Sequence, residues 1–129
     1  MKKLALVFTL FVLAGCSIDQ NKAKSAVEAL EQRINTGDYA GATQYYSEQM
    51  NLNETPEQRA AKFKQLYDVV GDFVSMECLS AVNANDANDQ PCVNLEYKVK
   101  RTKINTIEDF TVVKEEGKYK ISDQNIKQQ

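Results

Sequence analysis

Residues 55–82, TPEQRAAKFKQLYDVVGDFVSMECLSAV, contain the point at which the pattern of the chain changes from helical to strand-like. Thr55 is a good N-capping residue, Pro56 suits the first helical position, and Gln58 follows the cap by three residues, so a helix is predicted to begin here. Its apolar residues recur at helical spacing: Ala60, Phe63, Leu66 or Tyr67, and Val70. Gly71 is a natural C-terminal stop. The apolar stretch Phe73–Val82 then predicts a strand.

Two further helices are predicted upstream of this one. The first is indicated by apolar residues at the spacing of one helical face: Ala23, Ala26, Val27, Leu30 and Ile34. Gly37 ends it, and Asp38 can cap a second helix whose inner side carries Tyr39, Ala42, Tyr45 or Tyr46, and Gln49 or Met50. Residues 51–54 are predicted to form a polar connector.

Downstream, the alternating residues 93–100 indicate a half-buried strand, and the Asn- and Asp-containing stretch 83–90 indicates an exposed loop. Residues 107–114 and 118–122 flank Glu115-Glu116-Gly117, whose Gly suits a short hairpin loop. Residues 123–129 are polar and are predicted to fray, with Ile126 as a late anchor. The predicted fold is α+β, with three N-terminal helices packed on one face of a four-stranded antiparallel sheet. A single domain is expected over residues 23–126, with a tail at 127–129.

The first sixteen residues have the order of an export signal. Lys2 and Lys3 are followed by the stretch 4–13, apolar apart from Thr9, and by the small residues before Cys16. The stretch is too short to span a bilayer comfortably, so residues 1–15 are predicted to be a signal peptide. The alternative is a buried N-terminal helix.

The sequence Leu13-Ala14-Gly15-Cys16 resembles the lipobox of bacterial lipoproteins. The resemblance implies that Cys16 is lipidated and becomes the mature N-terminus, with several acyl chains providing a stable membrane anchor. It also implies sorting to the outer membrane facing the periplasm in enteric-type bacteria, because Ser17 rather than Asp follows Cys16. Residues 16–22 are then a short tether that keeps the domain close to the membrane.

Composition excludes several classes of function. With 16 Lys+Arg against 18 Asp+Glu and no clustered basic surface, the chain is not expected to bind nucleic acid. The chain has no His, which removes the commonest general base and the commonest metal ligand. We therefore predict no catalytic residue, no metal and no cofactor.

Cys78 and Cys92 remain after Cys16 is assigned to lipid, and they flank the predicted loop at 83–90. Two cysteines in an exported chain predict a disulfide. Direct pairing of the two positions would, however, place Ser75 and Glu77 on the same face as Leu95 and Val93, which a bulge in the first strand would repair. No basic or helix-terminal group nearby favours a redox-active thiol instead.

The order of these short motifs resembles one known group of proteins. A helix ends in Asn-Thr-Gly-Asp-Tyr at 35–39, the Thr-Pro-Glu-capped helix ends in Val-Gly at 70–71, and a strand pair contains Lys-Glu-Glu-Gly-Lys-Tyr-Lys-Ile at 114–121. Residues 23–126 resemble small secreted or lipid-anchored bacterial domains of unknown function with a cystatin-like or nuclear transport factor 2-like fold. Tyr119 stands where that group often has Trp. The resemblance implies a curved sheet wrapped around a long helix, with a cone-shaped cavity or a sheet face used for ligands or dimerisation.

Aromatic residues are the candidate lining of such a pocket. They are Tyr45, Tyr46, Phe63, Tyr67, Phe73 and Tyr97, with Tyr39 nearby. The alternative is that they are core residues. Lys98, Lys100, Arg101 and Lys103 could contact phosphates, although a solvated strand face is the simpler interpretation, and Asp86 and Asp89 lack the ligand spacing of a calcium loop.

Three functional hypotheses follow. The first is a non-catalytic binding or interaction module of the bacterial envelope that has a protein partner and could form a homodimer through the sheet face. A related alternative is a small-molecule or lipid carrier that binds its ligand in the cavity between helices and sheet. The second is an inhibitor or immunity-type envelope protein. The third is a hydrolase or isomerase that uses a carboxylate in the cone, with Asp68 or Asp72 as the base.

Overall fold

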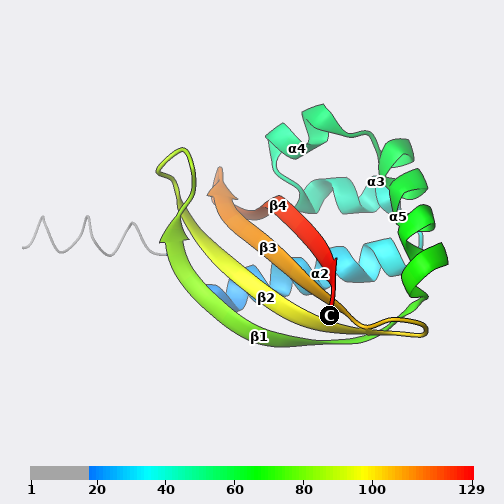
Figure 1. Cartoon of the computed structure of the whole chain (residues 1–129). Coiled ribbons are helices and arrows are strands. Elements are labelled where there is room, and N and C mark those ends of the chain that lie inside the picture. The colour runs from blue at the N-terminus through cyan, green and yellow to red at the C-terminus, as the bar shows by residue number, and fades with distance from the viewer. Residues whose placement is uncertain (1–17) are drawn as a thin grey trace, which may run out of the picture.

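The computed structural model describes residues 18–129, which form an α+β structure with one open, four-stranded antiparallel sheet (Figure 1). The elements in chain order are α2 (Gln20–Asn35), α3 (Tyr39–Ala42), the 3₁₀ turn η1 (Thr43–Tyr45), α4 (Glu48–Asn53), α5 (Pro56–Val70), β1 (Phe73–Asn85), β2 (Pro91–Arg101), β3 (Thr106–Glu115) and β4 (Lys118–Gln128). This confirms the predicted α+β class and the four-stranded sheet. The signal peptide and Cys16 lie outside the described residues. No helix between residues 18 and 129 is long and apolar enough to cross a membrane.

Helix α2 begins earlier than the sequence pattern predicted. Asp19 caps it by accepting hydrogen bonds from the backbone N–H groups of Asn21 and Lys22, so the helix starts at Gln20 rather than Ala23. Ile18 is buried in the core. The predicted tether is therefore wrong over its described part, because these residues are packed against the domain.

The predicted second helix is broken into α3, η1 and α4. Between η1 and α4, Tyr46 forms a parallel bridge with Ile121, and the Ser47 N–H donates to the Ile121 carbonyl at 2.8 Å. Pairing with β4 requires extended backbone at this point, and Ser47 then caps α4. The predicted polar connector is also wrong, because residues 51–53 belong to α4.

Helix α5 confirms the prediction made from residues 55–71. The Thr55 hydroxyl accepts from the Gln58 N–H and the Gln58 side chain accepts from the Thr55 N–H, which is a capping box. The helix ends at Val70, and Gly71 follows with a φ of +88°. This backbone turns the chain from α5 into β1.

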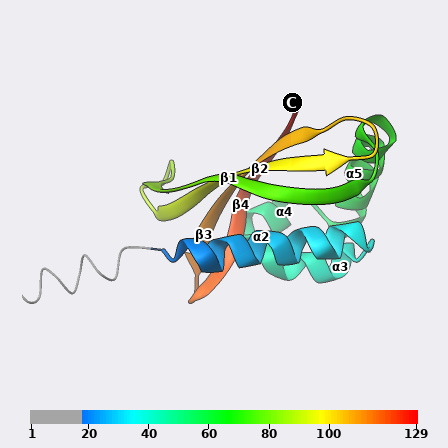
Figure 2. The ribbon, with the colours of Figure 1, turned by 90° about the horizontal axis from the view of Figure 1, so that it is seen from below.

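The sheet has the order β1-β2-β3-β4, and its strands curve around α2 (Figure 1). Figure 2 shows α2 and α3 on the same side of the sheet, while α5 stands at one end of it. The core side of the sheet carries alternate residues of the two central strands: Val93, Leu95, Tyr97 and Val99 of β2, and Phe110 and Val112 of β3. They pack against the inner face of α2, which includes Val27, Leu30 and Ile34.

Both outer strands are longer than predicted. β1 continues to Asn85, so the loop to β2 is confined to residues 86–90, where the Asp86 N–H donates to the Gln90 carbonyl. β4 continues to Gln128, so the predicted frayed tail is wrong, and the domain does not end at residue 126. The β4 residues are mostly polar because β4 is an edge strand, and its pairing with β3 along residues 106–115 holds it in place.

The predicted disulfide is not formed. Cys78 pairs with Tyr97 and Cys92 pairs with Ala84, and both thiols are free. The two cysteines are therefore about six residues apart along the hairpin, on the order of 20 Å, whereas a disulfide needs Cα atoms within about 7 Å. β1 does contain bulges, at Phe73/Ser75 and Cys78/Ser80, but they set this register rather than the one a disulfide would need.

Candidate functional site

Four charged side chains are buried inside the domain. Glu31, Arg59, Arg101 and Glu108 expose between 0% and 4% of their surface. Charged side chains are almost never buried this completely unless they are paired or bind something. The four residues come from α2, α5, β2 and β3, so the fold brings them together from distant parts of the sequence.

One group, which we call the Glu31–Glu108 cluster, consists of Glu31, Arg101, Thr106 and Glu108. The Arg101 Nη2 lies 2.5 Å from the Glu108 Oε2, and its Nε donates to the Thr106 hydroxyl at 3.1 Å. The Thr106 hydroxyl donates in turn to the Glu108 Oε2 at 3.2 Å. A charged pair this deep depends on such additional hydrogen bonds. They satisfy it only in part, because the Arg101 Nη1 and the Glu108 Oε1 have no hydrogen-bond partner within residues 18–129.

Glu31 is the second carboxyl beside a single guanidinium. Burial raises its pKa well above the ordinary value, and the neighbouring Glu108 raises it further, while Arg101 lowers it. Since one arginine can neutralise only one carboxylate, the protonated form of Glu31 is favoured in the folded chain. A carboxyl with a raised pKa is a candidate general acid or base, but both carboxyls are sealed in the core, at 2% and 0% exposure.

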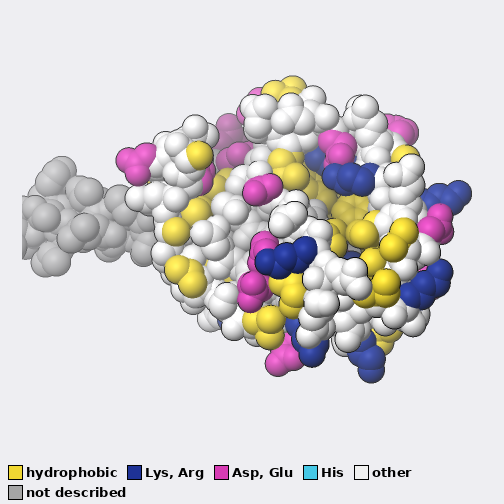
Figure 3. Space-filling model, viewed as in Figure 1, with side chains coloured by type: hydrophobic (Ala, Val, Ile, Leu, Met, Phe, Trp, Pro, Cys, Tyr) yellow, Lys and Arg dark blue, Asp and Glu magenta, His cyan; other side chains and the backbone are white. Residues whose placement is uncertain are grey.

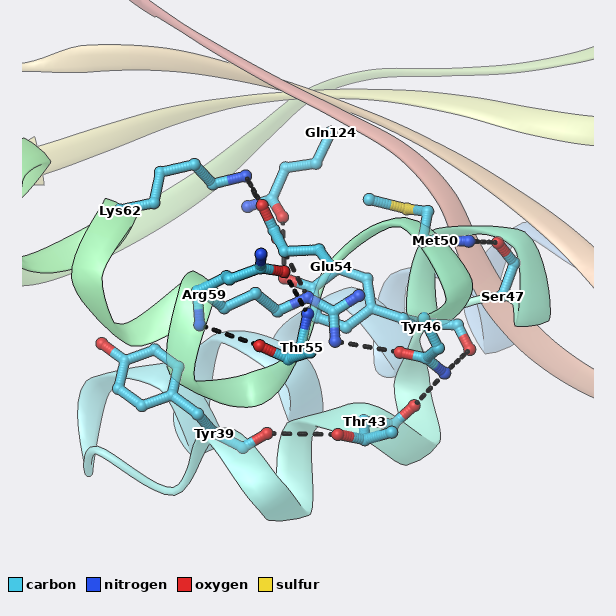
Figure 4. Close-up of polar contacts among 12 residues, drawn as sticks. Tyr39, Thr43, Tyr46, Ser47, Met50, Glu54, Thr55, Arg59, Lys62 and Gln124 are labelled. Atoms are coloured by element: carbon cyan, nitrogen blue, oxygen red, sulfur yellow. Dashed lines mark hydrogen bonds and ion pairs between the residues drawn. The ribbon is translucent and has the colours of Figure 1, made fainter.

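The second group, the Arg59 cluster, consists of Tyr46, Asn51, Glu54, Arg59, Lys62 and Gln124 (Figure 4). The Arg59 Nε lies 3.1 Å from the Glu54 Oε1, and its Nη1 donates to the Asn51 Oδ1 at 2.9 Å. The guanidinium carbon lies 3.8 Å from the centre of the Tyr46 ring, within cation–π range. The Tyr46 hydroxyl donates to the Gln124 Oε1 at 3.0 Å, which connects the helices to β4.

Two buried N–H donors of the Arg59 cluster have no hydrogen-bond partner within residues 18–129. They are the Nη2 of Arg59 and the Nε2 of Gln124. A buried donor without a partner costs about 1–3 kcal/mol, so such groups mark a place where an acceptor fits. Both belong to side chains that meet at the Tyr46 hydroxyl and ring.

The molecule is hollowed between β4 and α5, below α4 (Figure 3). Hydrophobic side chains form the floor of this hollow, and Lys or Arg and Asp or Glu side chains lie along its edge near α4. Because Gln124 belongs to β4 while Arg59 and Lys62 belong to α5, the Arg59 cluster joins the two walls. The depressions between α4 and the β3–β4 turn and beside the β1–β2 loop are lined mainly by polar and charged residues.

The six predicted pocket residues all lie in or against the core, but they do not form one group. Phe63 and Tyr67 contact one another with ring centres 6.0 Å apart, and Tyr67 lies under Arg101 at 5.1 Å. Tyr97 packs edge-on against Phe110. Tyr46 belongs to the Arg59 cluster, Phe63 lies beneath Lys62 of that cluster with 5.9 Å between the Nζ and the ring centre, and Tyr45 and Phe73 are half-buried.

Sequence reasoning missed the buried charges, although weak signals for them were present. Glu31 continues the apolar face of α2, four residues after Val27 and three before Ile34. Arg101 follows residues 93, 95, 97 and 99 at the same two-residue spacing, so it lies on the buried side of β2. Glu108 likewise lies on the buried side of β3. A charged residue at an inward position of such a pattern was the available signal.

The other candidates from the sequence lie apart from the hollow. Asp68 lies on α5 and Asp72 directly follows it; both are exposed, so neither is a buried carboxylate of the kind that the enzyme hypothesis requires. Lys98 and Lys100 lie on the side of β2 that faces away from α2. In the part of the chain that the structure describes, no group of three Cys, Asp or Glu side chains could hold a metal.

The chain was compared with known proteins by a scan against family models and a search of curated proteins, and neither finds a match.

Proposed function

We propose that this chain is a lipid-anchored, non-catalytic binding module of the bacterial cell envelope, and that a small organic molecule occupies the hollow between β4 and α5. The lipobox-like sequence ending at Cys16 supports the anchor and the envelope location. The observation that carries the binding role is the hollow itself, with its hydrophobic floor and charged edge. Pockets for small molecules are concave and mostly apolar, with few polar groups that fix orientation.

The finer assignment to a cystatin-like or nuclear transport factor 2-like fold is part of this proposal. It is supported by the curvature of the sheet around α2 and by the position of α5 at the end of the sheet (Figure 1). In folds of this kind the space between the helices and the curved sheet is the usual ligand site. A fold alone does not decide function, so the site residues must carry the test.

The test is the identification of a molecule that copurifies with the full chain. Leu66 is half-buried against the core on the same face of α5 as Phe63, so Leu66→Trp narrows the hollow. Val69 is 64% exposed on the same helix, so Val69→Trp is the matched control. The chain is extracted gently from membranes and its bound small molecules are measured by mass spectrometry.

We expect the wild type and Val69→Trp to release the same organic compound in near-equal amounts, and Leu66→Trp to release much less. Circular dichroism checks that both variants are folded. If the wild type and Val69→Trp carry no more compound than Leu66→Trp does, the hollow is not a binding site and the proposal fails.

A second candidate, a homodimer or protein complex formed through β1, is favoured by one observation. Val74, Leu79 and Val82 of this edge strand are each about half exposed, at 50%, 47% and 55%. Exposed apolar residues gathered on one element mark interaction surfaces. Sedimentation of the full chain in detergent tests it: a wild-type dimer that Val82→Lys dissociates is expected, and a monomeric wild type would exclude the homodimer.

A further inference from the structure

We propose that the hollow selects an organic acid, and that the carboxylate of this ligand is bound between Arg59 and Gln124 while its apolar part lies on the hydrophobic floor. This inference rests on the proposed binding function and adds the chemical class of the ligand. It comes from three independent features of the Arg59 cluster: its charge, its unpartnered donors and its fixed geometry.

The charge of the cluster favours an anion. Glu54 is its carboxylate, and both Arg59 and Lys62 pair with it, at 3.1 Å and 2.9 Å. Two cations therefore share one anion, and the cluster carries one unbalanced positive charge. Lys62 is 60% exposed at the edge of the hollow, whereas Arg59 is buried at 1%, so the deeper of the two cations is the one least screened by water. A cationic ligand group would be repelled here.

The unpartnered donors specify where the anion is held. The Arg59 side chain is almost fully buried, yet its Nη2 has no partner among the described residues, and neither has the Gln124 Nε2. A carboxylate has two oxygen atoms, so it can accept a hydrogen bond from each of these donors. Hydrogen bonds from a charged donor to a carboxylate are stronger than those to a neutral oxygen.

The geometry of the two donors is set by Tyr46. Its ring lies against the Arg59 guanidinium, and its hydroxyl donates to the Gln124 Oε1, which leaves the Nε2 of that amide free to donate (Figure 4). Burial raises the pKa of the Tyr46 hydroxyl, so it remains a donor over the physiological pH range. Gln124 reaches down from β4 while Arg59 and Lys62 extend from α5, so both walls contribute to the same site (Figure 4).

The experiment uses two probes with the same apolar part and different head groups, hexanoate and hexan-1-ol. The full chain is held in bilayer nanodiscs at neutral pH and titrated by calorimetry, with empty nanodiscs as the blank. Hexanoate is ionised under these conditions. We expect hexanoate to bind at least about tenfold more tightly than hexan-1-ol, because its carboxylate accepts charge-assisted hydrogen bonds that the hydroxyl of the alcohol does not.

Two variants test the assigned residues. Gln124→Glu keeps the shape of the side chain but replaces the donor by a carboxylate, so hexanoate affinity should fall at least about tenfold while hexan-1-ol affinity is retained. Lys62→Gln, on the exposed surface, should weaken hexanoate a few-fold by removing the unbalanced charge. The matched controls are Asn125→Asp, at an exposed position next to Gln124, and Lys64→Gln on α5, and neither should change binding.

The outcomes separate this inference from the function on which it rests. If hexan-1-ol binds as tightly as hexanoate and Gln124→Glu has no effect, the hollow is an apolar site and the carboxylate assignment is wrong. If neither probe binds the folded wild-type chain, both the assignment and the proposed function fail.

Discussion

At the scale of single residues, the most informative feature is the ratio of charges in the Glu31–Glu108 cluster. Two carboxyls share one guanidinium, and Arg101 is bonded to Glu108. The folded structure therefore favours the protonated form of Glu31, because loss of the proton would place an unpaired negative charge in the core. Tyr46 and Tyr67 face Glu31 from the helical side, and both remain neutral because burial raises their pKa.

This shared proton makes stability depend on pH. The unfolded chain releases it at the ordinary pKa of glutamate, while the folded chain holds it to higher pH. Over that interval the folded state binds more protons, so the free energy of unfolding decreases as pH rises. Glu31→Gln keeps a neutral group in place and removes this decrease. Urea denaturation should therefore show the variant gaining stability relative to the wild type as the pH rises above the ordinary pKa of glutamate, about 4.3. If the difference in unfolding free energy between Glu31→Gln and the wild type does not change with pH, Glu31 does not have a raised pKa in the folded chain.

The two carboxyls should also compensate for one another. Glu31→Gln leaves Glu108 to neutralise Arg101, and in Glu108→Gln the neighbouring Glu31 can ionise and do the same. Only the double variant leaves Arg101 without a counterion, which costs about 3–5 kcal/mol. The loss of unfolding free energy in the double variant should therefore exceed the sum of the losses in the two single variants by about 1 kcal/mol or more. Asp109→Asn with Lys127→Gln, an exposed pair at 3.6 Å, should be additive in the same denaturation experiment.

At the scale of elements, the helix and strand boundaries that depend on residues close in sequence were predicted correctly. The capping box at Thr55 and Gln58, the stop at Gly71 and the alternation of β2 were readable because each involves residues close in sequence. The break in the second predicted helix was not readable, because it depends on the pairing of Tyr46 with Ile121, far along the chain. The polar outer half of β4 likewise forms a strand only because β3 offers it a partner.

Gly71 gives a prediction at this scale. A Cβ at this position would lie 2.6 Å from the Lys103 backbone nitrogen and 2.2 Å from the Thr102 hydroxyl, in addition to the strain of a positive φ. Gly117 also has a positive φ, but nothing lies within 4 Å of its Cβ position. Gly117→Ala should cost only the backbone strain, about 1–2 kcal/mol, while Gly71→Ala costs clearly more. Equal losses in thermal denaturation would show that the contact with residues 102–103 is not tight.

At the scale of the whole molecule, the candidate site exists only because the chain folds back on itself. Tyr46, Phe63 and Tyr67 could be predicted as inward aromatics, but their charged neighbours come from α2, α5, β2 and β3. No spacing within one element indicates that Arg59 and Gln124 meet, since they lie in different elements and one is in a strand predicted to fray. The register of β1 with β2, which separates the cysteines, depends on two bulges that leave little trace in composition.

The separation of the cysteines can be measured on the intact protein. Cys78 lies on the core side of β1, and Cys92 lies on the opposite side of the sheet. We expect both thiols of the denatured, unreduced full chain to react with iodoacetamide, as shown by mass spectrometry. In the native protein Cys78 should react first, because Cys92 is buried. Burial, and to a smaller extent the nearby Asp86, also raises the pKa of the Cys92 thiol, so less of the reactive thiolate is present. A peptide linking residues 78 and 92 would contradict the register.

The burial of Ile18 fixes the place on the domain at which the described chain begins. The Ile18 carbonyl accepts a hydrogen bond from the Asn83 side chain at 2.9 Å, and the Asp19 N–H donates to the Tyr119 hydroxyl at 3.2 Å. The described chain therefore begins in contact with β1 and β4, near the end of the sheet that carries the β1–β2 loop and the β3–β4 turn. The hollow lies toward α5, at the other end of the domain (Figure 3). Under the proposed lipidation of Cys16, the anchor would join the chain close to Ile18, at the end of the domain opposite the hollow. The proposed ligand would then reach the hollow from the aqueous compartment rather than laterally from the bilayer.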